Sequence, residues 1–198
     1  MGKFRPFAAG FRVRFPHNQL MTSTASDSFV LRDLDRHNAS DLEWVANGMH
    51  LTLLEVEGDK ARQAYTITWA RARLRELLDS TRPHPAHVYL AVARDNPMHI
   101  VGHTILRINA MPDGGLYGLV STTFVDPVHR RSGIADSLLR RGEAWIRGQG
   151  MLEAATWTSA TNVRLIRLYE KHNYVVTERA PHADGTMMVR LTKALKAA

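Results

Sequence analysis

The sequence predicts a mixed α/β (α+β) fold in which helices cover both faces of one central sheet. Short apolar runs rich in β-branched residues alternate with longer stretches whose apolar residues recur at helical spacing. These segments follow in the order β-α-α-β-β-β-α-β-α-β-β, and such a mixture of adjacent strands and strand–helix–strand units is typical of a mixed sheet. The chain has 198 residues, 44% of them hydrophobic, which is enough for one core.

The first half of the chain is expected to form one strand, two helices and three further strands. Asn38–Asp41 offers capping residues for the first helix, and Gly58–Asp59 breaks its apolar pattern. Arg82–Pro85 ends the second helix, and Asp95–Pro97 is a turn between strands. The expected bounds are Phe29–Leu34 for the first strand, Lys60–Asp79 for the second helix, and His87–Ala93, Ile100–Ile108 and Leu116–Val125 for the next strands.

The second half is expected to form two strand–helix units and a closing pair of strands. Gly148–Gly150 ends the first of its helices, because glycine readily terminates a helix. Apolar residues of that helix, Leu138 and Leu139 among them, form one buried stripe. The expected bounds are Ile134–Arg147 and Val163–His172 for the helices, and Leu152–Thr158, Tyr174–Glu178 and Met187–Thr192 for the strands.

One segment, VDPVHRRSGIA at Val125–Ala135, has the pattern of an anion-binding turn. A strand ends at Val125, and a basic turn with Gly133 leads directly into a helix. The first turn of a helix has unpaired backbone N–H groups and the positive end of the helix dipole, and glycine lets a phosphate approach closely. The segment therefore suits a pyrophosphate. An ordinary strand-to-helix connection is the alternative; neither a Rossmann nor a Walker motif occurs.

This segment resembles the cofactor-binding motif of the GNAT superfamily of N-acetyltransferases, which reads Arg or Gln, two residues, Gly, one residue, then Gly or Ala. Arg130, Gly133 and Ala135 match it. Asn162, followed by LYEKHNY at Leu168–Tyr174, is similar to the family's later motif. The resemblance covers about residues 29–193 and implies a GNAT-like mixed central sheet.

The resemblance also implies a role for each motif residue. Backbone groups of the strand before the turn would bond the pantetheine arm of acetyl-coenzyme A, and the turn and helix start would hold its pyrophosphate. Asn162 would contact the arm, and Tyr169 would protonate the departing thiolate. Tyr169 as a packed core aromatic is the alternative. The implied cofactor-binding residues are Thr123, Phe124 and Val125 for the arm, and Arg130, Arg131, Ser132, Gly133, Ile134, Ala135 and Asp136 for the pyrophosphate.

These roles imply an N-acetyltransferase that moves an acetyl group from acetyl-CoA to a primary amine by direct attack on the thioester. The chain has no cysteine, which excludes a cysteine nucleophile and disulfides, and no metal site is expected. The alternative is a non-catalytic acyl-CoA-binding or regulatory module, because the base is not evident: many relatives carry a glutamate where this chain has Trp157. Asp136 is a second departure from the family, since it places a negative charge beside the phosphates. The candidates for the general base are His103, Glu55, Glu57 and Asp113, or a chain of water molecules leading to backbone carbonyls.

Partners and location are less constrained. The acceptor is expected to be a small-molecule or peptide amine, and a homodimer is left open. No apolar run approaches the ~18 residues of a membrane span, and a cytoplasmic location is expected. We expect one domain over residues 27–198 after a basic, flexible extension over 1–26. Residues 1–20 have four Lys or Arg and no acid, so an organelle transit segment or a nucleic-acid contact is the less favoured alternative.

Overall fold

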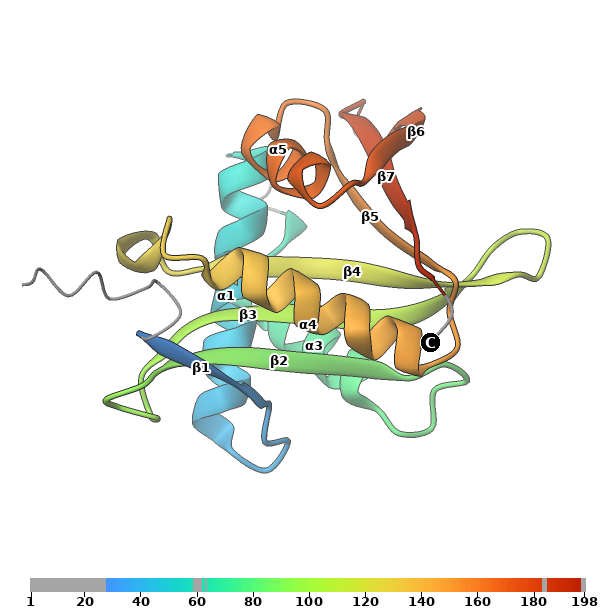
Figure 1. Ribbon diagram of the computed structural model, residues 1–198. Coiled ribbons are helices and arrows are strands. Elements are labelled where there is room, and N and C mark those ends of the chain that lie inside the picture. Colours follow the sequence, from blue (N-terminus) through green and yellow to red (C-terminus); the bar gives the residue numbers. More distant parts are fainter. Residues whose placement is uncertain (1–27, 59–61, 63, 183–184, 197–198) are drawn as a thin grey trace, which may run out of the picture.

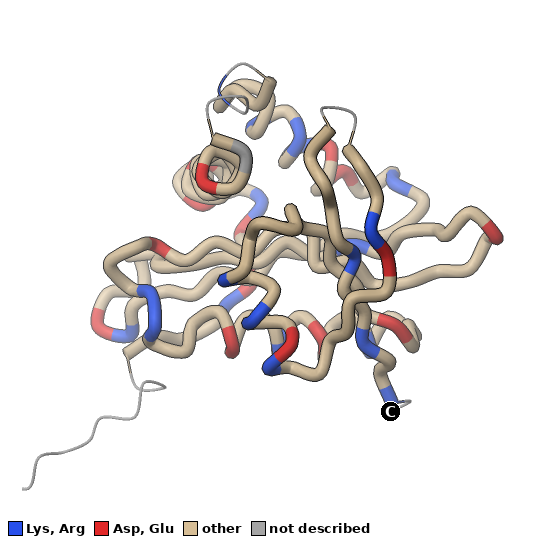
Figure 2. The backbone as a smooth tube through the Cα atoms, turned by 90° about the horizontal axis from the view of Figure 1, so that it is seen from above, with Lys and Arg blue, Asp and Glu red and all other residues tan. Residues whose placement is uncertain are grey.

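The computed structural model describes residues 28–58, 62, 64–182 and 185–196 (Figure 1). The extension expected over residues 1–26 lies outside these residues. Within the described part, the elements follow the predicted order, with a short 3₁₀ helix, η2 (Pro127–His129), added between β4 and α4. Charged residues are spread over helices, strand ends and loops (Figure 2).

Seven strands form one mixed sheet in the order β1-β2-β3-β4-β5-β7-β6. Neighbouring strands are antiparallel except β4 and β5, which are parallel. The predicted mixed sheet is therefore confirmed. The strands are β1 (Phe29–Asp33), β2 (Ala86–Ala93), β3 (Ile100–Ala110), β4 (Leu116–Val125), β5 (Glu153–Ser159), β6 (Val175–Pro181) and β7 (Met187–Ala194).

The described residues contain four α-helices, which lie on both faces of the sheet. Helix α4 crosses one face, α1 and α3 lie behind the other, and α5 lies beside the strands that follow β4 (Figure 1). The side chain of Asn38 caps α1 by accepting hydrogen bonds from the N–H groups of Ser40 and Asp41, as the sequence predicts. The bounds are α1 (Ala39–Glu57), α3 (Ile67–Leu78), α4 (Ile134–Gly148) and α5 (Val163–Lys171).

Helix α3 begins later than the sequence predicts. Thr66 has an extended backbone (φ −68°, ψ 163°), and its side chain accepts a hydrogen bond of 3.2 Å from the N–H of Trp69. A residue in this conformation caps a helix and cannot continue one. One continuous helix over Lys60–Asp79 is therefore wrong, because α3 starts at Ile67; Lys60 itself lies outside the described residues.

Two apolar cores lie above and below the sheet. Leu138, Leu139 and Ile146 of α4 are almost completely buried against one face, as the predicted stripe requires. Val45 of α1 and Leu74 of α3 are buried against the other face. Each such side chain contributes about 1.5–3 kcal/mol by leaving water, so both helical layers are held mainly by apolar burial.

The sheet opens between β4 and β5. These strands pair only at Gly118 with Ala154 and at Leu119 with Ala155. One residue further on, the hydroxyl of Thr156 donates a hydrogen bond of 2.9 Å to the carbonyl of Val120, in place of a ladder bond. A bulge in β4 follows, because Ile105 of β3 lies opposite Thr122 while Leu106 lies opposite Val120. The last residues of β4 are thus left without a β5 partner, and we call this divergence the fork.

Candidate active site

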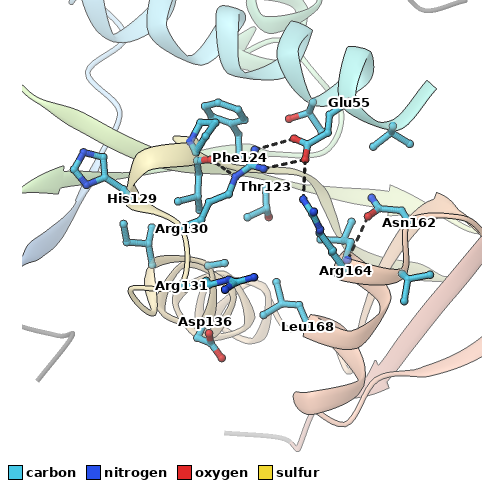
Figure 3. Close-up of a pocket in the computed structure, with 18 of the residues that line it drawn as sticks. Glu55, Thr123, Phe124, His129, Arg130, Arg131, Asp136, Asn162, Arg164 and Leu168 are labelled. Carbon is cyan, nitrogen blue, oxygen red and sulfur yellow. Dashed lines mark hydrogen bonds and ion pairs between the residues drawn. The ribbon is translucent and has the colours of Figure 1, made fainter. Parts of the chain in front are cut away.

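A cavity of about 960 Å³ lies at the open end of the fork (Figure 3). Three segments that are far apart in sequence line it: the end of α1, the end of β4 with the turn into α4, and the start of α5. Its volume is at the upper end of the ~300–1,000 Å³ usual for ligand pockets, which suits an elongated ligand. The lining residues are Thr52, Glu55, Val56, Thr123, Phe124, Val125, Pro127, His129, Arg130, Arg131, Gly133, Ile134, Ala135, Asp136, Thr161, Asn162, Val163, Arg164, Leu165 and Leu168.

The turn between β4 and α4 presents backbone N–H groups at this cavity. The carboxylate of Asp126 accepts a hydrogen bond of 3.0 Å from the N–H of Val128 and so fixes η2. Arg131 (φ 64°) and Gly133 (φ 81°) then have left-handed backbones, a conformation that is strained for arginine and easy for glycine. Gly133 precedes α4 without a side-chain cap, so the first N–H groups of the helix stay available. Such a turn binds anions.

Arg130 is held in the cavity by two acceptors. Its Nε donates to the carbonyl of Val125 at 3.0 Å, and its two terminal nitrogens form a bidentate ion pair with Glu55 at 2.9 and 2.8 Å. Arg164 of α5 approaches the same carboxylate at 3.7 Å, so two arginines converge on Glu55 (Figure 3). This carboxylate comes from the end of α1, and an anion that enters the cavity must compete with it for Arg130.

Asp136, on the first turn of α4, is compensated by two basic groups. Its Oδ1 accepts hydrogen bonds from Lys171 at 2.7 Å and from the ring of His172 at 2.9 Å. Burial alone would raise the pKa of Asp136, but these hydrogen bonds and charges outweigh burial and hold the pKa below its ordinary value. The negative charge that is unfavourable beside a phosphate is therefore used to tie α4 to the end of α5.

Asn162 connects α5 to β5. Its Oδ1 accepts a hydrogen bond of 3.3 Å from the N–H of Leu165, which caps the helix, and its Nδ2 donates to the hydroxyl of Thr158 at 3.1 Å. Both ends of the amide are thus engaged at the cavity wall. The start of α5 is fixed relative to the strand that leaves the fork.

Tyr169 lies in the core beside the cavity and not on its surface. It is 2% exposed and packs edge-on against Tyr174, with ring centroids 4.8 Å apart. Burial raises the pKa of its hydroxyl to about 12, against a smaller lowering by hydrogen bonds with Thr156 and Thr123. Thr123 lines the cavity and Thr156 holds the fork, so the hydroxyl reaches the fork from the α4 side of the sheet. It is protonated at neutral pH and can donate a hydrogen bond.

The structure brings together most of the residues that the motifs single out. Only two lie off the cavity: Tyr169, which is buried behind Thr123, and Ser132, whose hydroxyl donates to the carbonyl of His129. The residues that line the cavity as one group are Thr123, Phe124, Val125, Arg130, Arg131, Gly133, Ile134, Ala135, Asp136 and Asn162.

His103 is removed from the candidates for the general base. It is fully buried between α1 and the sheet, where its ring lies 5.7 Å from that of Trp44 and 6.0 Å from that of Phe124. Burial lowers the pKa of His103 to about 3. The ring fits only because residue 48 is glycine: a Cβ there would lie 2.6 Å from the imidazole. A base must reach its substrate and take up a proton near neutral pH, and His103 does neither.

The other candidates do not supply a base at the fork within the described residues. Glu55 lines the cavity but is paired with Arg130. Asp113 lies on the exposed turn between β3 and β4, where it accepts a hydrogen bond from the N–H of Gly115 and does not line the cavity. The side chain of Glu57 lies outside the described part of the chain.

Two residues that sequence reasoning missed complete the site. Arg164 enters the cavity from α5, two residues after Asn162, and a cation so close to the second motif was a usable signal. Thr156 holds the fork through a long-range bond to Val120, and nothing in the local pattern of β5 distinguishes it from a threonine that merely fills space.

Comparison with known proteins places the chain in a family. Residues 56–174 match the model of the Acetyltransferase (GNAT) family. The chain therefore belongs to the GNAT acetyltransferases, which confirms the predicted family and, with it, acetyl-CoA as the donor. A search of curated proteins found no match.

Solved structures share the fold at low sequence identity. A chain of the NatC complex bound to Gag peptide and CoA superposes with a TM-score of 0.67 at 18% identity, covering 85% of this chain and 99% of that one. Arabidopsis thaliana NAA60 in complex with a bisubstrate analogue superposes with a TM-score of 0.64 at 16% identity, covering 86% of this chain and 100% of that one. Aminoglycoside 6'-N-acetyltransferase complexed with coenzyme A superposes with a TM-score of 0.60 at 16% identity, covering 83% of this chain and 96% of that one. These matches confirm the GNAT fold.

The described residues contain neither a membrane-spanning helix nor a metal-binding cluster. None of the helices that they form is long and apolar enough to cross a membrane. Among the same residues, no group of three or more His, Cys, Asp or Glu side chains could hold a metal ion.

The ion pair between Glu55 and Arg130 generates the first prediction. Because Glu55 competes with an incoming phosphate for Arg130, Glu55→Gln should lower the Kd for coenzyme A. The side chains are 47% and 33% exposed, so the effect should be modest, about two- to five-fold. Calorimetric titration measures it.

Glu43→Gln is the matched control, because Glu43 forms a similarly exposed ion pair with Arg71 and does not line the cavity. This variant should leave the Kd unchanged. Weaker binding by Glu55→Gln would mean that the carboxylate orients Arg130 for the donor and does not compete with it.

Proposed function

We propose that this protein transfers an acetyl group from acetyl-CoA to a primary amine by direct attack of the amine on the thioester. One observation carries the proposal: the anion-binding turn and the free end of β4 line a single cavity that ends at the fork, and the buried hydroxyl of Tyr169 lies directly behind Thr123 at that end. When bound, the donor supplies the activated acetyl thioester. The residues described below bind it, orient it and stabilise charge.

The residues that line the cavity match the parts of the donor in turn, from the pyrophosphate to the arm that ends in the thioester. Backbone N–H groups from Arg131 to Asp136 and the guanidinium groups of Arg130 and Arg164 would hold the pyrophosphate. The backbone of Thr123–Val125 lacks a β5 partner and would bond the amide-bearing arm as an added strand would. Asn162 would contact the same arm. These assignments rest on the unpaired backbone groups and on the surplus positive charge.

Tyr169 would stabilise the leaving thiolate by donating a hydrogen bond. With a pKa of about 12, its hydroxyl stays protonated at neutral pH. Complete proton transfer to a thiolate, whose conjugate acid has a pKa of ~8.5, would be uphill by about 5 kcal/mol. We therefore propose that Tyr169 donates a hydrogen bond as the charge develops, with full protonation of the thiolate completed later by solvent.

The acceptor amine would lose its proton without a dedicated protein base. Among the described residues that line the cavity, both carboxylates, Glu55 and Asp136, are held in ion pairs. His129 also lines it, but this residue belongs to η2 in the anion-binding turn, and its ring lies 5.3 Å from that of His99. Water leading to backbone carbonyls at the fork would carry the proton away. The acceptor itself is proposed only as a small-molecule or peptide amine; the solved neighbours include a complex bound to a peptide and an enzyme that acts on an aminoglycoside.

A non-catalytic acyl-CoA-binding module is the second candidate. The lack of an evident base and the burial of Tyr169 favour it. Thiol release from acetyl-CoA, measured with a panel of small and peptide amines, separates the two functions. Thiol release that depends on an added amine supports the acetyltransferase. Binding of acetyl-CoA without thiol release for every amine supports the non-catalytic module.

Tyr169→Phe tests the proposed mechanism, because it keeps the ring and removes the hydroxyl. We expect kcat to fall by about 10²–10³-fold, the usual scale for loss of one donor to a developing oxyanion or thiolate, with little change in the Kd for coenzyme A. Pre-steady-state measurement of the transfer step checks this. Tyr174→Phe is a control for packing. An unchanged transfer step in Tyr169→Phe would leave Tyr169 as a core aromatic only.

The missing base predicts a particular pH dependence. The value of kcat/KM should rise with pH until the acceptor amine itself is neutral, because only that form attacks. Replacing the acceptor by an amine of lower pKa should move the inflection down by the same amount. An inflection that stays fixed while the acceptor changes would reveal a protein base.

We also propose that residues 27–198 form the catalytic domain and that the basic extension is dispensable. Deleting residues 1–20 should leave the melting temperature and kcat nearly unchanged. Thermal denaturation and steady-state kinetics measure both. A loss of several degrees would show that the extension packs on the domain or on a second copy.

A further inference from the structure

A small apolar cluster, buried except for part of Trp157, lies on the face of the sheet opposite to α4, beside the fork. Tyr117 and Leu119 of β4 and Ala155 of β5 form a cluster that is separate from the two cores. Trp157 packs against it and stays partly exposed. We call these four residues the apolar floor. It includes Leu119 and Ala155, the last residues that β4 and β5 pair before they diverge.

Three arginines, Arg73, Arg82 and Arg107, lie at the edge of this floor. Their positive charges outnumber the carboxylates beside them. Glu76 is bonded to Arg73 at 2.6 Å and lies 3.5 Å from Arg82. Asp79 also interacts with the charge of Arg82, so two carboxylates face three guanidinium groups. The Nε atoms of Arg82 and Arg107 are buried and have no hydrogen-bond partner among the described residues. Burial, with the neighbouring charges of Arg73 and Arg82, lowers the pKa of Arg107. We call the three side chains the arginine cluster.

Such a cluster is unfavourable unless an anion completes it. Like charges repel more strongly where water is partly excluded. A buried N–H group without an acceptor costs the full free energy of its desolvation, because no hydrogen bond replaces the one it made to water. On the opposite side of the floor, the guanidinium of Arg190 lies 4.9 Å from the ring centre of Tyr117, but Glu153 already pairs with it. The surplus of donors is therefore on the side of Arg107.

The cluster is close enough to the fork to contact a substrate held there. Arg107 lies opposite Leu119 in the β3–β4 ladder, one position from the pair Leu106 and Val120. With strands ~4.8 Å apart and a rise of ~3.4 Å per residue, the Cα atoms of Arg107 and Val120 are about 6 Å apart. An extended arginine side chain reaches further than this, so Arg107 can meet an anionic group on a molecule whose amine lies at the fork.

We propose that the arginine cluster and the apolar floor form the acceptor subsite, and that the preferred acceptor is an amine whose body carries a carboxylate. This inference rests on the proposed acetyl transfer at the fork. The donor would occupy the face that holds Tyr169, so the acceptor would arrive over the other face, across the apolar floor. The carboxylate comes either from acidic residues of a peptide or from a small amino acid, and the chemistry recognised is the same.

Two sets of probes test this with the full-length chain in the presence of coenzyme A or acetyl-CoA. One set is peptides that share an N-terminal alanine and carry Asp, Asn or Lys at the next three positions. The other is alanine beside alaninamide. Calorimetry measures binding, and acetyl transfer gives kcat and KM separately. In one of the two sets, we expect the probe that carries the carboxylate to be preferred over the neutral probe by about 10- to 100-fold, through a lower KM. If this is the peptide set, the carboxylate comes from acidic residues of a peptide; if it is the alanine set, it comes from a small amino acid.

Variants assign the preference to the cluster. Arg107→Gln should abolish most of it, whereas Arg107→Lys, which keeps the charge, should retain part of it. Arg140→Gln, on the exposed surface of α4, is the matched control and should retain all of it. Circular dichroism confirms that each variant is folded.

Five outcomes are decisive. A preference that Arg107→Gln abolishes supports the subsite. A preference for the neutral or basic probes, a preference that survives Arg107→Gln, or no binding in either set would overturn it. Acidic probes that bind through Arg107 but are never acetylated would support the subsite and contradict the proposed function.

Discussion

The site depends on where β4 and β5 stop pairing. These strands are parallel neighbours for two residue pairs, and then the hydroxyl of Thr156 takes the place of the next ladder bond to Val120. Divergence leaves the end of β4 with unpaired backbone groups, which would be costly in a closed core but are useful to a ligand that carries amides. The anion-binding turn follows directly on that strand end, so one break in the sheet positions both parts of the donor site.

Near the fork, the carboxylates are held in ion pairs, whereas some of the hydrogen-bond donors have no acceptor. Asp136 is paired with Lys171 and His172, and Glu55 is paired with Arg130, so these carboxylates tie the helices to the cavity without presenting free negative charge to a phosphate. The backbone N–H groups of the turn and the guanidiniums of the arginine cluster, by contrast, have fewer acceptors than donors. These two unbalanced groups suit the anionic donor and the carboxylate-bearing acceptor that we propose.

Local pattern was enough to predict the order of the elements, the capped start of α1, the turn at Gly133 and the family. Each of these is encoded within a few neighbouring residues, through apolar periodicity, capping or turn chemistry. The break at Thr66 was missed because the apolar spacing continues across it, and threonine is also tolerated inside helices. The burial of His103, the role of Thr156 and the pairing of Glu55 with Arg130 depend on contacts between residues up to 75 positions apart, which one sequence cannot supply.

In the proposed mechanism, the donor binds along the open edge of β4 and on the turn before α4. Backbone amide resonances of this 22.3 kDa chain, followed while coenzyme A is added, test it most directly. We expect the largest shifts at the amides of Thr123–Val125 and Arg131–Asp136, and none in β1 at the far edge of the sheet. Shifts concentrated elsewhere, with those amides unmoved at saturation, would contradict the placement of the donor at the fork.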